Sequence, residues 1–155
     1  MVAARGGALE EVEVLRIMVA CLEGLKAVHG CGLVHRDIKG SNIMAHNLPE
    51  GGILYKIIDF GIAMAADEDG GATVATAMKT GGVRGVGTAH YMSPEQYGGE
   101  DITATTDIYS LGVTMFYCLT GHLPFADGET RPNKILRAIC GMNEAPSVHE
   151  IVRLI

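Results

Sequence analysis

The stretch Val34-His35-Arg36-Asp37-Ile38-Lys39-Gly40-Ser41-Asn42 constrains the fold and the function more than any other part of the chain. It follows the apolar end of an expected helix and combines charged, imidazole and amide side chains within a few residues. Such a mixture is costly to bury and is not needed in a surface turn, so chemistry at a shared site is the simplest reason to hold it together. Asp37 can accept a proton, Lys39 can neutralise an anion, and Asn42 can bind a metal through its amide oxygen.

The residues before this stretch predict an amphipathic helix that begins at Leu9 and ends before Gly30. Acidic residues come first, and Lys26 and His29 come last, which suits the direction of the helix dipole. Glycine then ends the helix. The apolar residues that recur at spacings of three and four are Leu15, Met18, Leu22 and Leu25.

The residues after the stretch predict a small hairpin. Two short apolar runs, Ile43-Met44 and Ile53–Ile58, flank a turn-rich segment at residues 47–52. Paired in this way, the two strands would place Asn42 and Asp59 at adjacent ends.

The remainder of the chain alternates a loop with helices. Residues 65–87 are rich in Gly, Ala and Thr and lack apolar periodicity, so a long mobile loop is expected there. A helix from about Asp107 to Leu119 is apolar on most faces, which places it in the middle of a core. An amphipathic helix is predicted from Pro132 to Cys140, and another helix start at Val148–Ile155.

Composition sets the outer limits on the class of protein. The chain of 155 residues is long enough for one compact domain, and 48% hydrophobic residues argue against disorder. The net charge of −6 argues against nucleic acid or an anionic membrane as a general partner. Four separated cysteines form no C-x-x-C pair, so neither a disulfide framework nor a zinc site is expected, and an intracellular, cytoplasmic setting is favoured. Residues 1–7 are not typical of a signal peptide, and no apolar run is long enough for a membrane segment.

Taken together, several motifs resemble those of eukaryotic-type protein kinases, in family order and over about residues 10–140. They are His35-Arg36-Asp37-Ile38-Lys39-Gly40-Ser41-Asn42, Asp59-Phe60-Gly61, Ser93-Pro94-Glu95 and Asp107-Ile108-Tyr109-Ser110-Leu111-Gly112. The resemblance implies an α+β, protein-kinase-like fold: a mainly α-helical C-terminal lobe with a small β-hairpin at the catalytic loop. It makes residues 1–155 a partial kinase domain, with the catalytic loop at 34–42 and the activation segment at 59–95.

The resemblance also assigns chemistry to individual residues. Asp37 would orient the substrate hydroxyl and accept its proton, and Lys39 would face the transferring phosphate of ATP. Asn42 and Asp59 would each hold Mg²⁺ with the hard oxygen ligands that this ion prefers. Lys39 together with Thr88 is typical of serine/threonine kinases, which implies proteins bearing Ser or Thr as substrates.

Other residues are implied to support the site rather than to react. His35 and Phe60 would pack in an apolar column, with Gly61 after them, and Asp107 would bond the backbone of the catalytic loop from beneath. Glu95 would pair with an arginine further along the chain. Arg36 is able to clamp a phosphate on the activation loop, and Thr80 is the best-placed candidate phosphosite. Arg84, however, stands where many relatives carry the phosphorylated threonine, which argues against simple activation by phosphorylation.

The sequence departs from the family pattern in one major respect. No glycine-rich loop and no Val-Ala-Ile-Lys-like strand lysine are present, and Lys56 is no substitute because it lies three residues before Asp59. We therefore expect the small N-terminal lobe and the last helices to be missing. The chain is expected to be a fragment that exposes apolar surface and has no appreciable kinase activity by itself.

Two alternatives belong to other classes. A pseudokinase-like binding module would dock kinase substrates or partners without catalysis, although intact Asp37, Asn42 and Asp59 speak against it. A small-molecule phosphotransferase of related fold usually lacks the Arg-Asp-x-Lys pattern and the Ser-Pro-Glu segment, both of which this chain has.

Overall fold

A computed structural model of the chain describes residues 8–60 and 86–141. In order, the elements are α1 (Glu11–Gly30), the 3-10 turn η2 (Gly40–Asn42), β1 (Ile43–Asn47), β2 (Ile53–Ile57), α3 (Val86–Ala89), α4 (Pro94–Gly98), α5 (Ala104–Thr120) and α6 (Pro132–Cys140). Residues 65–85 of the loop expected over 65–87, and the helix start expected at Val148–Ile155, lie outside the described residues.

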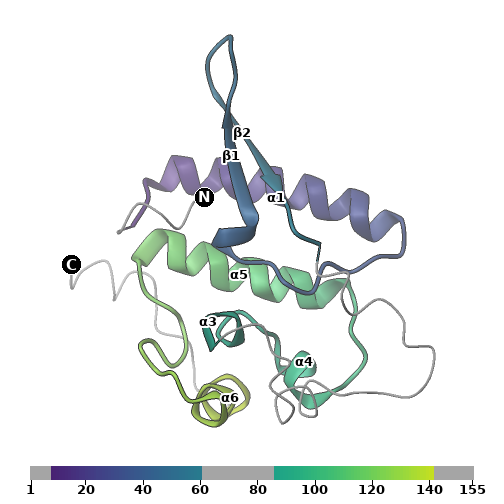
Figure 1. The fold of residues 1–155 in the computed structure, drawn as a ribbon, viewed down its shortest axis with the longest axis vertical. Coiled ribbons are helices and arrows are strands. Elements are labelled where there is room, and N and C mark those ends of the chain that lie inside the picture. The colour runs from purple at the N-terminus through teal and green to yellow at the C-terminus, as the bar shows by residue number, and fades with distance from the viewer. Residues whose placement is uncertain (1–7, 61–85, 142–155) are drawn as a thin grey trace.

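The described chain is arranged around the pair of long helices α1 and α5, which lie side by side (Figure 1). The hairpin of β1 and β2 rises past α1, while α3, α4 and α6 lie on the other side of α5. Side chains from α1, α5, the loop at residues 34–42 and the hairpin form one core: Val14, Ile17, Met18, Cys21, Leu25, Ile38, Ile43, Tyr55, Leu111 and Cys118. A smaller core joins α3, α4 and α6 through Ala89, Tyr97, Ile135 and Ile139.

Helix α1 confirms the predicted helix but not the face that the apolar spacing indicated. Met18 and Leu25 are buried, whereas Leu15 is 48% exposed and Leu22 is 46% exposed. The helix carries two apolar rows, and spacing alone cannot tell which row faces the core. Contacts with α5 and β2 make that choice and bury Ile17 completely.

The hairpin is antiparallel as predicted, with Ile43 paired to Ile57 at its base and Asn47 to Ile53 near its tip. Strand β1 is longer than the apolar pair that predicted it, because strand pairing continues through polar residues once it has begun. Gly51 closes the turn with φ 94°, a conformation that other residues rarely adopt.

Helix α5 begins at Ala104, one turn before the predicted start at Asp107. The hydroxyl of Thr103 accepts a hydrogen bond from the backbone of Thr105 and so caps the helix. The expectation of an apolar helix was partly wrong, since Ser110 and Thr114 are buried and Ile108 is 47% exposed. These buried hydroxyls donate to carbonyls one turn earlier, so their burial leaves no unpaired donor: Ser110 to Thr106 (3.2 Å), Thr114 to Ser110 (2.8 Å) and Thr120 to Phe116 (2.8 Å).

Two short helices, α3 and α4, were not predicted, and α3 begins at Val86, inside the stretch 65–87 that was expected to be loop. Helix α6 has the predicted bounds, with Pro132 in its first turn. All four cysteines are free, and burial raises the pKa of the Cys21 and Cys118 thiols to about 11. No helix in the described ranges is long and apolar enough to cross a membrane.

The burial pattern of α1 can be tested with a matched pair of variants. Ile17→Ala should lower the free energy of unfolding by about 3 kcal/mol, because it leaves a cavity in the core. Leu15→Ala should lower it by less than about 1 kcal/mol, because this side chain is already half exposed. Urea unfolding followed by circular dichroism measures both losses, and equal losses would contradict the observed face.

Candidate active site

The catalytic-loop backbone is held by one buried carboxylate, that of Asp107 in α5. This side chain is 0% exposed. Its Oδ1 accepts a hydrogen bond from the backbone N–H of Arg36 (2.8 Å), and its Oδ2 accepts one from the backbone N–H of His35 (2.8 Å). The ring Nε2 of His29, at the end of α1, lies 2.7 Å from the same Oδ2 and donates to it. Three donors thus compensate a charge that would otherwise be costly to bury.

These bonds hold Arg36 in a strained conformation. Its φ is 69°, in the left-handed region that an arginine adopts at a cost of about 1–2 kcal/mol. A further bond, from the side-chain amide of Gln96 in α4 to the carbonyl of Arg36 (3.0 Å), supports the same conformation. Asp37 follows directly, and its carboxylate accepts hydrogen bonds from the other polar groups of the loop.

The carboxylate of Asp37 lies at the centre of a hydrogen-bond network. Lys39 Nζ donates to both of its oxygens (3.0 and 2.9 Å) and also to the hydroxyl of Thr88 in α3 (2.9 Å). The side chains of Asp37 and Lys39 are each 18% exposed, so both reach solvent while most of their surface is covered. The structure therefore brings together Asp37, Lys39 and Thr88, although 49 residues separate the last two.

Asn42 is oriented by the same network. Its Nδ2 donates to the backbone carbonyl of Asp37 (2.8 Å) and to the carboxylate of Asp37 (2.9 Å), which assigns the amide nitrogen to that side. The amide oxygen Oδ1 then faces away from Asp37, with the hydroxyl of Ser41 at 3.5 Å.

Asp59 follows the end of β2, at the strand end adjacent to Asn42. The backbone N–H of Ile58 donates to the carbonyl of Asn42 (2.9 Å), which extends the strand pairing by one step and places Asp59 next in line. Asp59 is exposed and has a φ of 62°. An amide oxygen and a carboxylate fit Mg²⁺, which takes one or two carboxylates and leaves positions for phosphate and water. Within residues 8–60 and 86–141, no group of three or more His, Cys, Asp or Glu is placed to hold a metal.

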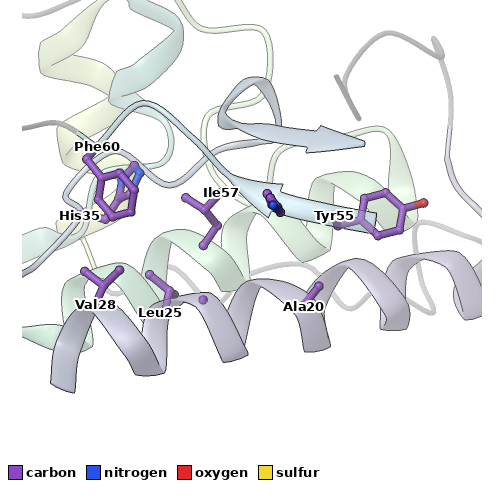
Figure 2. Close-up of a pocket in the computed structure, with 9 residues that line it drawn as sticks. Ala20, Leu25, Val28, His35, Tyr55, Ile57 and Phe60 are labelled. Atoms are coloured by element: carbon purple, nitrogen blue, oxygen red, sulfur yellow. The ribbon is translucent and has the colours of Figure 1, made fainter. Parts of the chain in front are cut away.

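His35 joins the polar loop to an apolar pocket. Its Nδ1 accepts a hydrogen bond from the backbone of Asp37 (3.3 Å), so the proton sits on Nε2, which donates to the carbonyl of Ile58 (3.2 Å). Its ring packs on that of Phe60, with centroids 4.9 Å apart. Figure 2 shows this ring pair at one end of a pocket of about 170 Å³ between α1 and β2, with Tyr55 at the other end. The sequence did not predict this pocket.

Glu95 in α4 has a partner that the sequence did not predict. The hydroxyl of Thr106 in α5 donates to its carboxylate (2.7 Å). Burial by itself raises the pKa of Glu95, but hydrogen bonds from its own backbone N–H, from Thr106 and from Ser93 together hold the pKa below its usual value. The bond fixes α4 against α5 near the point where Gln96 bonds the catalytic loop.

The contacts of three supporting residues were not predicted from the sequence: His29, Gln96 and Thr106. His29 lies 78 residues along the chain from its partner Asp107, and Gln96 lies 60 residues from Arg36. No local sequence pattern predicts either contact. Gly61 and Thr80, which the sequence singled out, lie outside the described residues.

Comparison with known proteins identifies the class of this site. The family model for the protein kinase domain matches residues 1–152. The chain belongs to the protein kinase family. A curated serine/threonine-protein kinase, drp72 of Corynebacterium efficiens, is 45% identical over 142 residues, which is 92% of this chain and 24% of that protein. Kinase PknA of Corynebacterium glutamicum is 41% identical over 92% of this chain and 27% of its own length. A probable serine/threonine-protein kinase PknB of Bifidobacterium longum is 42% identical over 77% of this chain and 16% of its own length.

The kinase chain therefore spans about a quarter, or less, of the length of these relatives. The match agrees with the predicted fold class, a mixed helical lobe with a two-stranded antiparallel sheet.

The anchor of the kinase catalytic loop can be tested by changing one atom. Asp107→Asn keeps the size of the side chain but replaces a carboxylate oxygen with an N–H₂ group that must face backbone donors. It should lower the free energy of unfolding by about 3 kcal/mol. Asp101→Asn, the same change at an exposed aspartate, should cost less than about 0.5 kcal/mol in the same urea titration. Equal effects would contradict the anchoring role of Asp107.

The contact of Glu95 predicts a dependence of stability on pH. Because the folded-state pKa of Glu95 is depressed, its contribution is full above the unfolded-state pKa of about 4.3 and is lost as the pH falls through the folded-state pKa. The wild-type chain should therefore be more stable than Glu95→Gln at pH 7, and this difference should shrink below about pH 4.5. Thermal unfolding measured between pH 7 and about pH 3 tests it, and a difference that grows on acidification would refute the assignment.

Proposed function

We propose that this chain orients the hydroxyl acceptor and binds the metal in the phosphorylation of protein serine and threonine side chains by ATP. The observation that carries the proposal is the network around Asp37, in which Lys39 and Asn42 both donate to one partly exposed carboxylate.

In this proposal, Asp37 accepts the proton of the substrate hydroxyl. The bonds from Lys39 and Asn42 keep its carboxylate in one orientation, which is what a positioned base requires. Lys39 places positive charge beside the acceptor and would face the negative charge of the transferring phosphoryl group. Its bond to Thr88 ties this lysine to α3, the segment expected to meet a Ser- or Thr-bearing substrate.

Asn42 and Asp59 are proposed to hold Mg²⁺. The amide oxygen of Asn42 is directed away from Asp37, and Asp59 follows at the adjacent strand end with its side chain exposed. Two oxygen ligands from the chain leave room for the phosphates of ATP, as Mg²⁺ requires. When bound, the metal would neutralise phosphate charge, and ATP would supply the phosphoryl group.

We further propose that the 155-residue polypeptide is a partial kinase domain without appreciable activity by itself. The sequence contains no glycine-rich loop and no strand lysine of the kind that grips ATP phosphates. The chain would therefore supply one side of the reaction site. The rival function, a non-catalytic docking module, would leave the Asp37 network without a purpose.

A hybrid protein tests the catalytic role. The parts of the Corynebacterium glutamicum relative that precede and follow its matched region would be joined to the two ends of this chain. The hybrid should transfer phosphate from ATP to serine and threonine of a generic protein substrate, and Asp37→Asn should reduce the rate about a thousandfold. Asp101→Asn in the same hybrid should leave the rate unchanged.

Two outcomes would count against these proposals. A folded hybrid that transfers no phosphate contradicts the proposed kinase function, and one that transfers it equally well with Asp37→Asn contradicts the role of Asp37. Phosphate transfer by the unmodified 155-residue chain, abolished by Asp37→Asn, contradicts the inactivity of the chain alone.

A further inference from the structure

Helix α1 carries an apolar row on the side opposite its buried residues. The members of this outer row are separated by three, four and three positions and lie along one side of the helix: Val12, Leu15, Val19 and Leu22. They are between 46% and 61% exposed, whereas Ile17 and Leu25 of the same helix face the core. Exposed apolar side chains that lie next to one another in this way mark a surface that binds another protein or another copy of the chain.

The spacing of the outer row indicates the shape of its partner. Apolar residues that alternate at intervals of three and four form the seam along which two helices pack side by side. Helix α1 is 20 residues long, so the row extends along a single element. The opposite side of this helix is held by α5 and β2, and Figure 1 shows α5 alongside it. The outer row therefore fits a matching row on another α-helix.

The charged residues beside the outer row fit a second copy of α1 that runs in the opposite direction. Arg16 and Glu23 are exposed, and their spacing of seven residues places both on the same flank of the row. In a symmetric dimer, this flank meets the same flank of the second copy. With Val19 at the two-fold axis, Arg16 of each copy lies within one position of Glu23 of the other. Two ion pairs then border the apolar contact, one on each side of the axis.

The ends of α1 favour the same direction. Glu11 lies in its first turn, whereas Lys26 and His29 lie toward its other end. In an antiparallel pair, Glu11 lies within one position of Lys26 of the second copy, and the two helix dipoles oppose each other favourably. A parallel pair would bring the two copies of Glu11 together, and likewise the two copies of Lys26. Charge complementarity thus selects a second copy of this chain, in the antiparallel orientation, as the occupant of the row.

We propose that the outer row of α1 is the interface of a symmetric dimer of this chain, with an axis at Val19. Leu15 of each copy packs beside Leu22 of the other, and Arg16 pairs with Glu23, so each contact occurs twice. Four apolar side chains from each copy make a small interface, and we expect a dissociation constant in the micromolar range. The interface does not depend on the proposed kinase function. His29, beside the candidate active site, lies about 15 Å from the axis along the helix, which leaves both sites open.

The first test is sedimentation velocity of the full chain across micromolar concentrations, where a reversible equilibrium of monomer and dimer is expected. Val19→Glu places two carboxylates at the axis and should raise the dissociation constant at least about tenfold. Its circular dichroism should not change, because Val19 is exposed in the monomer. Leu33→Glu is the matched control, since this leucine is 61% exposed and lies outside α1. It should leave the dissociation constant unchanged.

A charge exchange tests the proposed ion pairs. Arg16→Glu should raise the dissociation constant about tenfold, because it places two acidic side chains together on each side of the axis. Glu23→Arg should have a similar effect, since it places two cations together. The chain with both changes has the same pairs in reverse and should dimerise within about threefold of the unchanged chain. Single variants that dimerise normally, or a double variant weaker than either, would overturn the pairing.

Cysteine cross-linking tests the orientation, in a chain whose exposed Cys31 and Cys140 are changed to serine. Val19→Cys should form a disulfide between copies under mild oxidation, because the two thiols meet at the axis. Lys26→Cys should not, since its two thiols would lie about 21 Å apart along the helices. Cross-linking at both positions would indicate a parallel pair and overturn the antiparallel dimer. Cross-linking at neither position would overturn the interface itself.

Other outcomes would also overturn the second copy as the occupant. A chain that stays monomeric at every concentration has no such interface. Growth into large aggregates, or equal weakening by Val19→Glu and Leu33→Glu, would mean that association does not use a closed interface at the outer row. The hybrid described above supplies a rival occupant. A monomeric hybrid whose melting temperature falls with Val19→Glu, but not with Leu33→Glu, would assign the row to the added segments.

Discussion

The organisation of the candidate site depends on the buried carboxylate of Asp107. A fully buried charge is tolerated only when donors surround it, and here they come from the backbone of His35 and Arg36 and from the ring of His29. The same bonds hold Arg36 in a left-handed conformation that it would not adopt alone. The two backbone bonds both satisfy the buried charge and shape the loop, and the ring of His29 supplies the third donor to the carboxylate.

The rest of the fold supplies the rigidity that this arrangement needs. Helix α5, which carries Asp107, packs on α1, which carries His29, so the partners of the carboxylate are fixed by the apolar core between the two helices. On the other side, Gln96 bonds the loop while Glu95, its neighbour in α4, accepts from Thr106 in α5. Strain at Arg36 is thus balanced by long-range packing, as is usual for strained residues at functional sites.

Much of the candidate site could be predicted from sequence because its reactive groups lie close together in the chain. Asp37, Lys39 and Asn42 fall within six residues, and the short hairpin brings Asp59 beside Asn42 by simple strand pairing. The supporting contacts could not be predicted, since His29 and Gln96 reach partners 78 and 60 residues away. Local spacing carries no information about such pairs.

The sequence by itself determined the long helices, the hairpin, α6 and the identity of the polar groups at the loop, because periodicity, turn residues and side-chain chemistry are local properties. Only the tertiary structure decided which of two apolar rows on α1 is buried, where α5 begins, and that α3 and α4 are helical. These features depend on neighbours distant in the chain. The conformation of Arg36 is decided in the same way, because a left-handed arginine persists only where buried partners outweigh its cost.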